Sequence, residues 1–187
     1  IHTAEQALLK VIGKFSLLPE FTDIFNYAYK GNDEIIFAIR FADGEKTNWV
    51  ENFVYSGSLK GQFYDKEGNA LTDPLSLKGT GLLRHEYKWG LFSAMDDEDS
   101  RKRGTFLDCY NEDGSPAGIV LKKIMGIINS NGNRSYGDDY VMYRYADALL
   151  LMAEIQNAQG GDVAYYLNQI RERAYGDNYV EQRNGYK

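Results

Sequence analysis

The residues of this chain that could do chemistry are mainly carboxylates and aromatic rings, because histidine and cysteine are scarce. The two histidines, His2 and His85, are far apart in the sequence, and Cys109 has no histidine near it. The sequence contains no GxxxxGK[ST] phosphate loop, GxGxxG turn, HExxH zinc motif, CxxC pair or GxSxG nucleophile elbow. We therefore expect no catalytic residue, no metal site and no cofactor.

Carboxylates are plentiful, and two of them could hydrolyse a glycosidic bond if one were held in an apolar pocket with a raised pKa. The run Asp96–Asp99 stands before Arg101–Arg103, which is typical of a helix start with charges matched to the helix dipole. A calcium site at this run would need six or more converging oxygens, so we favour the helix start. Glu154 lies between apolar stripes, and we expect it to be buried and ion-paired with Arg171.

Aromatic residues make up 14% of the chain, with 15 Tyr, 9 Phe and 2 Trp. A tyrosine offers a flat apolar face and a hydroxyl, which suits polar, ring-shaped ligands such as sugars, although helix contacts would also use such side chains. Five of the rings fall in the glycine-punctuated stretch 42–81, whose irregular pattern is typical of a functional loop. The candidate stacking and hydrogen-bonding residues are Trp49, Tyr55, Tyr64, Trp89, Asn48, Asn52 and Lys88.

Charge and hydropathy exclude some classes of partner. The formal net charge of −6 argues against nucleic acid, which prefers a basic surface. The longest uninterrupted apolar run, 148–153, is far shorter than the roughly 20 residues of a membrane-spanning helix. The chain begins with neither Met nor a charged-then-apolar leader, so we expect that a signal was removed or that the numbering starts inside a longer protein.

The N-terminal third predicts short elements. Thr3 and Gln6 have the spacing of a capping box, an apolar stripe continues to Ile12, and Gly13 is a plausible helix stop. We further predict a helical turn over 21–25, a strand over 34–41, a helix over 82–92, and polar loops over 111–118 and 126–137.

The best-defined unit is a helical hairpin over 141–175. The first helix is predicted over Val141–Gln159 and the second over Val163–Tyr175, with a Gly160-Gly161 break and Asp162 as the N-cap. The first helix carries two apolar stripes, so it must be buried on two sides, as in a stacked tetratricopeptide-type repeat. We therefore predict a mainly α fold, a tetratricopeptide-like α/α superhelix with long irregular loops and one or two short strands or hairpins.

Two segments of this hairpin resemble the hallmark of the SusD/RagB family. The first is the helix motif Arg144-Tyr145-Ala146-Asp147-x-Leu149-Leu150-x-x-Ala153-Glu154, and the second is Asn168-x-Ile170-Arg171-x-Arg173-Ala174. The opening of the chain through Phe15-Ser16-Leu17-Leu18-Pro19 and the pairs Asp99-x-Arg101 and Thr105-Phe106 are also similar to the family. The motif residues Arg144, Tyr145, Ala146, Glu154, Asn168, Arg171 and Arg173 are expected to be scaffold residues.

The resemblance implies a cell-surface lipoprotein of the outer membrane that captures oligosaccharides or starch-like polysaccharides without catalysis. It also implies delivery of the glycan to a SusC-like TonB-dependent transporter. In such a protein aromatic side chains from loops meet the ligand, and the repeats serve the partner interface. The lipidated cysteine of the family is not in this sequence, and the chain resembles a middle-to-late fragment.

The chain is interpreted as part of one domain. Its expected parts are a helix and extended segment over 1–41, a loop-rich region over 42–137, the hairpin over 138–176 and a tail over 177–187. Two other functions stay open from the residues themselves. A tetratricopeptide-like adaptor for protein partners would explain the helices, and a glycoside hydrolase would require an unrecognised carboxylate pair.

Overall fold

The computed structural model describes residues 1–48, 63–71, 87–132 and 134–187. Its α-helices are α1 (His2–Leu8), α3 (Trp89–Ala94), α4 (Ser100–Thr105), α5 (Tyr145–Gln159), α6 (Val163–Tyr175) and α7 (Glu181–Asn184). Its 3-10 helices are η1 (Phe21–Phe25), η2 (Tyr27–Tyr29) and η4 (Gly176–Asn178). Helices hold more of the described residues than strands, in agreement with the mainly α prediction. None of these helices combines the length and the apolar content that crossing a bilayer requires.

The described strands form three small antiparallel sheets, which is more β-structure than predicted. The strands are β1 (Ile35–Ile39), β2 (Phe63–Tyr64), β3 (Ala70–Leu71), β4 (Phe106–Tyr110), β5 (Pro116–Leu121), β6 (Ile127–Ile128), β7 (Arg134–Ser135) and β8 (Tyr140–Arg144). One sheet has the order β3-β2-β4-β5, and β1–β8 and β6–β7 form two-stranded ribbons. Strands of two residues are too short to show an alternating pattern, so the sequence did not predict them.

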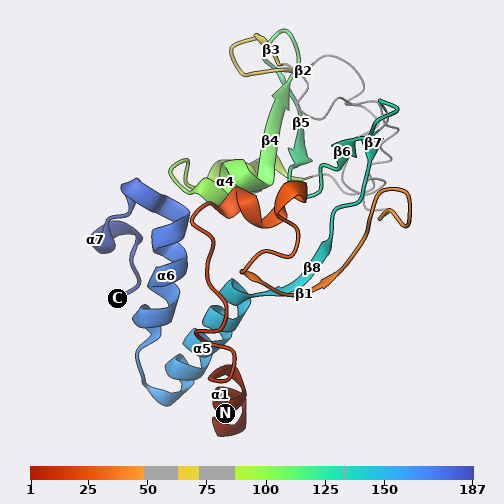
Figure 1. Ribbon diagram of the computed structural model, residues 1–187. Helices are drawn as coiled ribbons and strands as arrows, with labels where there is room; N and C mark the ends of the chain where they lie inside the picture. The colour runs from red at the N-terminus through yellow and green to blue at the C-terminus, as the bar shows by residue number, and fades with distance from the viewer. Residues whose placement is uncertain (49–62, 72–86, 133) are drawn as a thin grey trace.

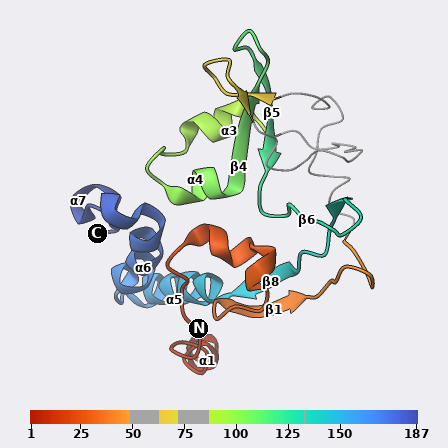
Figure 2. The same cartoon turned by 45° about the horizontal axis from the view of Figure 1, so that its top comes forward.

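The elements form two layers joined by the N-terminal segment. The α5–α6 hairpin lies on one side, and the four-stranded sheet with α3 and α4 lies on the other (Figures 1 and 2). Both views place η1 between α4 and the hairpin, and β1 pairs with β8 beside it (Figures 1 and 2). A segment from the beginning of the chain therefore lies between elements from its middle and its end.

The helical hairpin confirms most of its predicted features. Gly160 ends α5 with the left-handed φ of 71°, and the Asp162 side chain accepts the backbone N–H of Tyr165 at 3.0 Å. The helix α6 has the predicted bounds. The helix α5, however, begins at Tyr145, because residues 140–144 are used by β8 to pair with β1. The β-branched and aromatic side chains of this segment favour the strand, and the Asp147 carboxylate then accepts the Arg144 N–H at 2.9 Å to start the helix.

The core of the hairpin lies along α5. Ala146, Leu149 and Met152 are at most 1% exposed, and partly buried side chains from the first 36 residues and α6 pack around this helix. One expectation for α5 was wrong. Glu154 is exposed instead of buried, and Arg171 donates to the backbone carbonyl of Asn184 instead of pairing with Glu154.

Shorter elements confirm some predictions and correct others. Asp99 is the N-cap of α4 and accepts the N–H of Arg101 at 2.9 Å, as the acid-before-base pattern predicted. The turn η1 has the predicted bounds. Thr3 is not an N-cap, because α1 already begins at His2 and ends at Leu8, although Gly13 does adopt a left-handed φ of 81°. The predicted helix over 82–92 is α3 from Trp89 onward, and residues 82–86 lie outside the described part.

A buried carboxylate joins the hairpin to the N-terminal segment. Glu34 is 0% exposed, and its oxygens lie 3.3 Å from Arg144 Nη1 and 2.9 Å from Arg173 Nη1. The backbone N–H of Leu18 also donates to Glu34 at 2.9 Å. The Glu34 carbonyl accepts the N–H of Tyr145 at 2.8 Å. This one residue therefore contacts the linker before η1, the start of α5 and the last turn of α6.

Replacing Glu34 by alanine should lower the free energy of unfolding by about 3–5 kcal/mol, because the change leaves the buried guanidinium group of Arg173 and the partly buried one of Arg144 without their carboxylate. Urea denaturation of the purified protein measures this loss. Glu154→Ala is the matched control, since it removes the same group from an exposed position of α5 and should leave the unfolding midpoint almost unchanged. Equal effects of the two changes would contradict the role given to Glu34.

Candidate functional site

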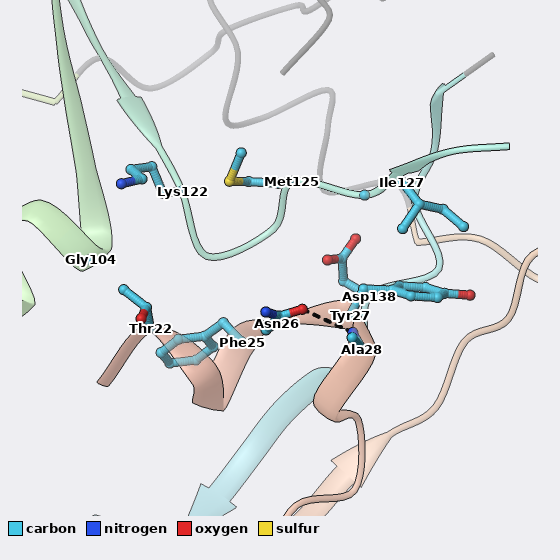
Figure 3. Close-up of a pocket in the computed structure, with 11 residues that line it drawn as sticks. Thr22, Phe25, Asn26, Tyr27, Ala28, Gly104, Lys122, Met125, Ile127 and Asp138 are labelled. Carbon is cyan, nitrogen blue, oxygen red and sulfur yellow. Dashed lines mark hydrogen bonds between the residues drawn. The ribbon is translucent and has the colours of Figure 1, made fainter. Parts of the chain in front are cut away.

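The candidate site is a pocket of about 450 Å³ between the η1–η2 segment and the chain that leaves β5. One wall holds Phe25, Asn26 and Tyr27, and the facing wall holds Lys122 and Met125 (Figure 3). The side chain of Asp138 enters from the segment after β7 (Figure 3). Its volume falls in the range of about 300–1,000 Å³ that is usual for small-molecule sites.

The two aromatic rings diverge because Asn26 interrupts the helical turns. Asn26 has an extended backbone between η1 and η2, and its side-chain oxygen accepts the N–H of Ala28 at 2.9 Å, the bond dashed in Figure 3. Phe25 lies edge-on to Phe21 with centroids 5.6 Å apart.

A Cβ on Gly104 would come within 2.8 Å of Phe21, so glycine at this position lets α4 approach η1 closely.

Each ring of the wall is held by a lysine that does not line the pocket. Lys123 Nζ lies 4.8 Å from the Phe25 centroid, and Lys30 Nζ lies 4.8 Å from the Tyr27 centroid. Cation–π contacts of this kind stabilise a ring in one orientation. The remaining surfaces of Phe25 and Tyr27 are thereby presented to the pocket as a preformed apolar wall.

Asp138 is the buried polar group of the site. It is 5% exposed, its backbone carbonyl accepts the Asn48 Nδ2–H at 2.8 Å, and its Oδ2 has no hydrogen-bond partner among the described residues. Burial raises the pKa of the Asp138 carboxyl above its ordinary value, against the opposing effects of the Asp138 and Gly126 backbone and the charges of Lys30 and Arg134. A buried carboxylate oxygen without a partner is a hydrogen-bond acceptor that a ligand could use.

Comparison with known proteins identifies the family of the chain. A model of the SusD family matches residues 59–187. The chain belongs to the SusD family. A comparison with curated protein sequences gives no match.

Solved structures agree with this family and its fold. A SusD superfamily protein from Bacteroides fragilis is 36% identical with a TM-score of 0.88, and the match covers 100% of this chain and 40% of that one. NanU from B. fragilis is 32% identical with a TM-score of 0.88, over 99% of this chain and 41% of that one. Surface glycan-binding protein A from Bacteroides thetaiotaomicron, in complex with laminarihexaose, shares the fold at 17% identity and a TM-score of 0.69, over 96% and 44%. This chain spans about two fifths of the length of these structures.

The SusD motif residues lie at structural positions in this chain. Arg144 and Arg173 bind Glu34, and the Tyr145 hydroxyl accepts the N–H of Gly13 at 3.2 Å. Asn168 exchanges two hydrogen bonds with the backbone of Tyr186. Ala146 is buried in the core of α5. Arg144, Tyr145 and Arg173 thus join segments that are more than 100 residues apart in the sequence.

The candidate stacking residues of the SusD-family chain divide into two groups. Trp49, Asn52 and Tyr55 lie outside the described residues. Tyr64 and Trp89 meet at Tyr110, since Tyr64 is the cross-strand partner of Tyr110 and the Trp89 ring lies 5.3 Å from it. Trp89 also packs on Phe92 at 6.1 Å, which gives it a packing role in the sheet.

The polar candidates also lie at different places. Lys88 is exposed at the N-cap of α3. Asn48 is 4% exposed and reaches the pocket indirectly, through its bond to Asp138. The pocket residues Phe25, Tyr27 and Asp138 were not predicted as ligand contacts, because nothing in their local sequence distinguishes them. In the described part of the chain, no three His, Cys, Asp or Glu side chains converge as metal ligands would.

Because its pKa is raised on folding, Asp138 should make the protein less stable as the pH rises from the ordinary value of 3.8 through the folded-state pKa. In that window the folded state binds more protons than the unfolded state, so stability falls with increasing pH. Asp138→Asn has no such titration, and all other groups titrate alike in both proteins. Urea unfolding of both from about pH 3 to about pH 7 should therefore show the wild type losing stability relative to the variant. If the difference in unfolding free energy between the two proteins stayed constant over this pH range, burial would not raise the pKa of Asp138.

Proposed function

We propose that this chain is part of a cell-surface glycan-binding protein that holds an oligosaccharide without cleaving it. The observation that carries the proposal is the pocket in a SusD-family fold, in which aromatic rings lie beside hydrogen-bonding groups. The laminarihexaose complex of a protein with the same fold supports a glycan ligand. Starch-like and other neutral glucans are the first candidates to test.

The proposed mechanism is stacking combined with hydrogen bonding. A pyranose ring has an apolar C–H face that can lie on the wall formed by Phe25 and Tyr27. Its hydroxyls can accept hydrogen bonds from the Lys122 ammonium group and the Asn26 amide, and can donate a hydrogen bond to the Asp138 carboxylate. Because both rings are already held in place by lysines, binding would cost little side-chain entropy.

The loop residues predicted from the sequence remain part of the proposal. Trp49 and Tyr55, with Asn52, would extend the stacking surface beyond the pocket. Asn48 precedes Trp49 in the sequence and is itself bonded to Asp138 of the pocket. Tyr64 and Trp89, which both contact Tyr110, would be a second candidate surface, with Lys88 beside Trp89 in the chain.

We further propose an outer-membrane lipoprotein that passes the glycan to a SusC-like TonB-dependent transporter. The α5–α6 hairpin would be one unit of a tetratricopeptide-like superhelix that serves this partner. Leu150 and Leu151, which are 38% and 46% exposed on α5, support the stacking of further helices on this face.

Polysaccharide affinity measurements separate this proposal from its rivals. We expect the full protein to be retained by an immobilised glucan or hemicellulose without releasing sugars during prolonged incubation. Released sugars would favour a glycoside hydrolase, and a protein that is neither retained nor hydrolytic would favour a protein adaptor. Affinity electrophoresis followed by a reducing-sugar assay gives both results, and Trp49→Ala in the same assay tests the loop.

Tyr27→Ala should weaken glycan retention about three- to tenfold, because it removes one ring of the stacking wall. Tyr29→Ala is the matched control, since Tyr29 lies on the same 3-10 helix, is 53% exposed and does not line the pocket. The dissociation constants of both variants can be compared by affinity electrophoresis. The same loss in both variants, or in neither, would count against Tyr27 as a stacking residue.

A further inference from the structure

The two consecutive lysines after β5 have different surroundings. Lys122 Nζ donates to the carbonyl of Arg103 at 2.9 Å. Lys123 Nζ has neither a hydrogen bond nor an ion pair with any described residue, and lies over the rings of Phe21 and Phe25 at 5.3 and 4.8 Å. Lys123 is half-buried, so water satisfies its charge poorly.

The acids near Lys123 are occupied by arginines. Arg144 and Arg173 also approach the Phe21 ring, at 6.0 and 5.3 Å, and both bind Glu34. Asp147 accepts the Arg144 N–H at 2.9 Å and lies 3.7 Å from its guanidinium group. Three cations therefore surround one ring, and Glu34 and Asp147 are engaged by the two arginines, which leaves Lys123 unpaired among the described residues.

The electrostatic environment agrees with this geometry. Burial and the positive charge of Arg144 lower the pKa of the Lys123 ammonium group, and the negative charge of Asp147 opposes this shift. An anion placed beside Lys123 would offset both unfavourable effects. No existing ion pair of the described residues would have to break for this to happen.

Lys123 also lines a second pocket, of about 310 Å³, with Arg144. Phe25 belongs to the walls of both pockets, so this pocket adjoins the candidate glycan site. Two acids, Asp139 and Asp147, line its other walls. Asp139 is paired with Lys30 at 2.9 Å, and Asp147 is paired with Arg144. Both carboxylates can therefore accept hydrogen bonds from ligand hydroxyls, and their paired charges repel a ligand anion less than free carboxylates would.

We propose that this second pocket binds the anionic group of an acidic sugar, a carboxylate or a sulfate, with Lys123 Nζ as its donor. The inference rests on the proposed function and specifies its ligand class. A glycan would place one sugar in the first pocket and the acidic group across Phe25 in the second. A charge-assisted hydrogen bond in a poorly solvated site is stronger than one between neutral groups.

The direct test is NMR titration of the wild-type protein with lysine ε-methylene labels. Glucuronic acid or glucose 6-sulfate should shift the Lys123 signal, and glucose at the same concentration should not. The carboxylate and sulfate arms identify which anion the pocket accepts. If neither anion shifts Lys123, the inference is wrong, even when neutral glycans are retained and the proposed function stands.

Polymers test the consequence for binding. Polygalacturonate and its methyl ester share one backbone and differ in charge, as dextran sulfate and dextran do. Lys123→Met should weaken retention of the charged polymer of the accepted pair about tenfold or more. Retention of the neutral polymer should fall by a smaller factor, because the variant also loses the cation–π contact with Phe25. Lys14→Met, at an exposed position of the N-terminal segment, is the matched control. Equal retention of charged polymers by the wild type and Lys123→Met would overturn the inference.

Discussion

The arrangement of this molecule depends on the buried contact of Glu34 with Arg144 and Arg173. The carboxylate is fully excluded from solvent, and its two oxygens are used by two guanidinium groups and one backbone N–H. Ion pairs of this kind contribute little net stability compared with apolar packing, but the loss of one partner leaves an uncompensated buried charge. The contact therefore selects one geometry, in which α5, α6 and the linker before η1 meet at one point.

That geometry also places the two pockets. The linker continues into η1, whose Phe21 ring lies against the same two arginines, and η1 then carries Phe25 to the boundary between the pockets. Because the arginines hold the acids near Lys123, this lysine is the group available to an anion. On the other side of Phe25, Asn48 holds the backbone of Asp138 so that its carboxylate enters the first pocket. The Glu34 ion pairs and the two candidate binding groups, Lys123 and Asp138, are thus connected through η1 and Phe25.

The family motif has a clear physical meaning in this context. Arg144 and Arg173 come from its two halves, which lie on α5 and α6, and they converge on a glutamate more than 100 residues away from either. Asn168 and Arg171 hold the C-terminal segment against α6 by donating hydrogen bonds to the backbone carbonyls of Tyr186 and Asn184. These residues specify how the hairpin is attached to the rest of the chain, and the proposed sugar-binding groups lie elsewhere. A motif can therefore identify the family and still give no information about the ligand.

The sequence by itself determined the elements whose signals are local. Helix α6 with its Asp162 cap, the Gly160 stop, the Asp99 cap of α4 and the turn η1 all follow from side chains within a few residues of the backbone they affect. The family followed as well, because both halves of its motif stand in the sequence of this chain.

The tertiary structure alone decided which charges are buried and which residues share a pocket. Glu34 and Glu154 are both carboxylates beside apolar residues, yet the fold buries the first and exposes the second. The start of α5 moved from Val141 to Tyr145 because β8 pairs with β1, a strand about 100 residues earlier. Asp138, Lys123 and Phe25 acquire their roles in the same way. The physical reason is that burial and ion pairing depend on contacts between distant segments, whereas caps and turns depend on neighbours in the chain.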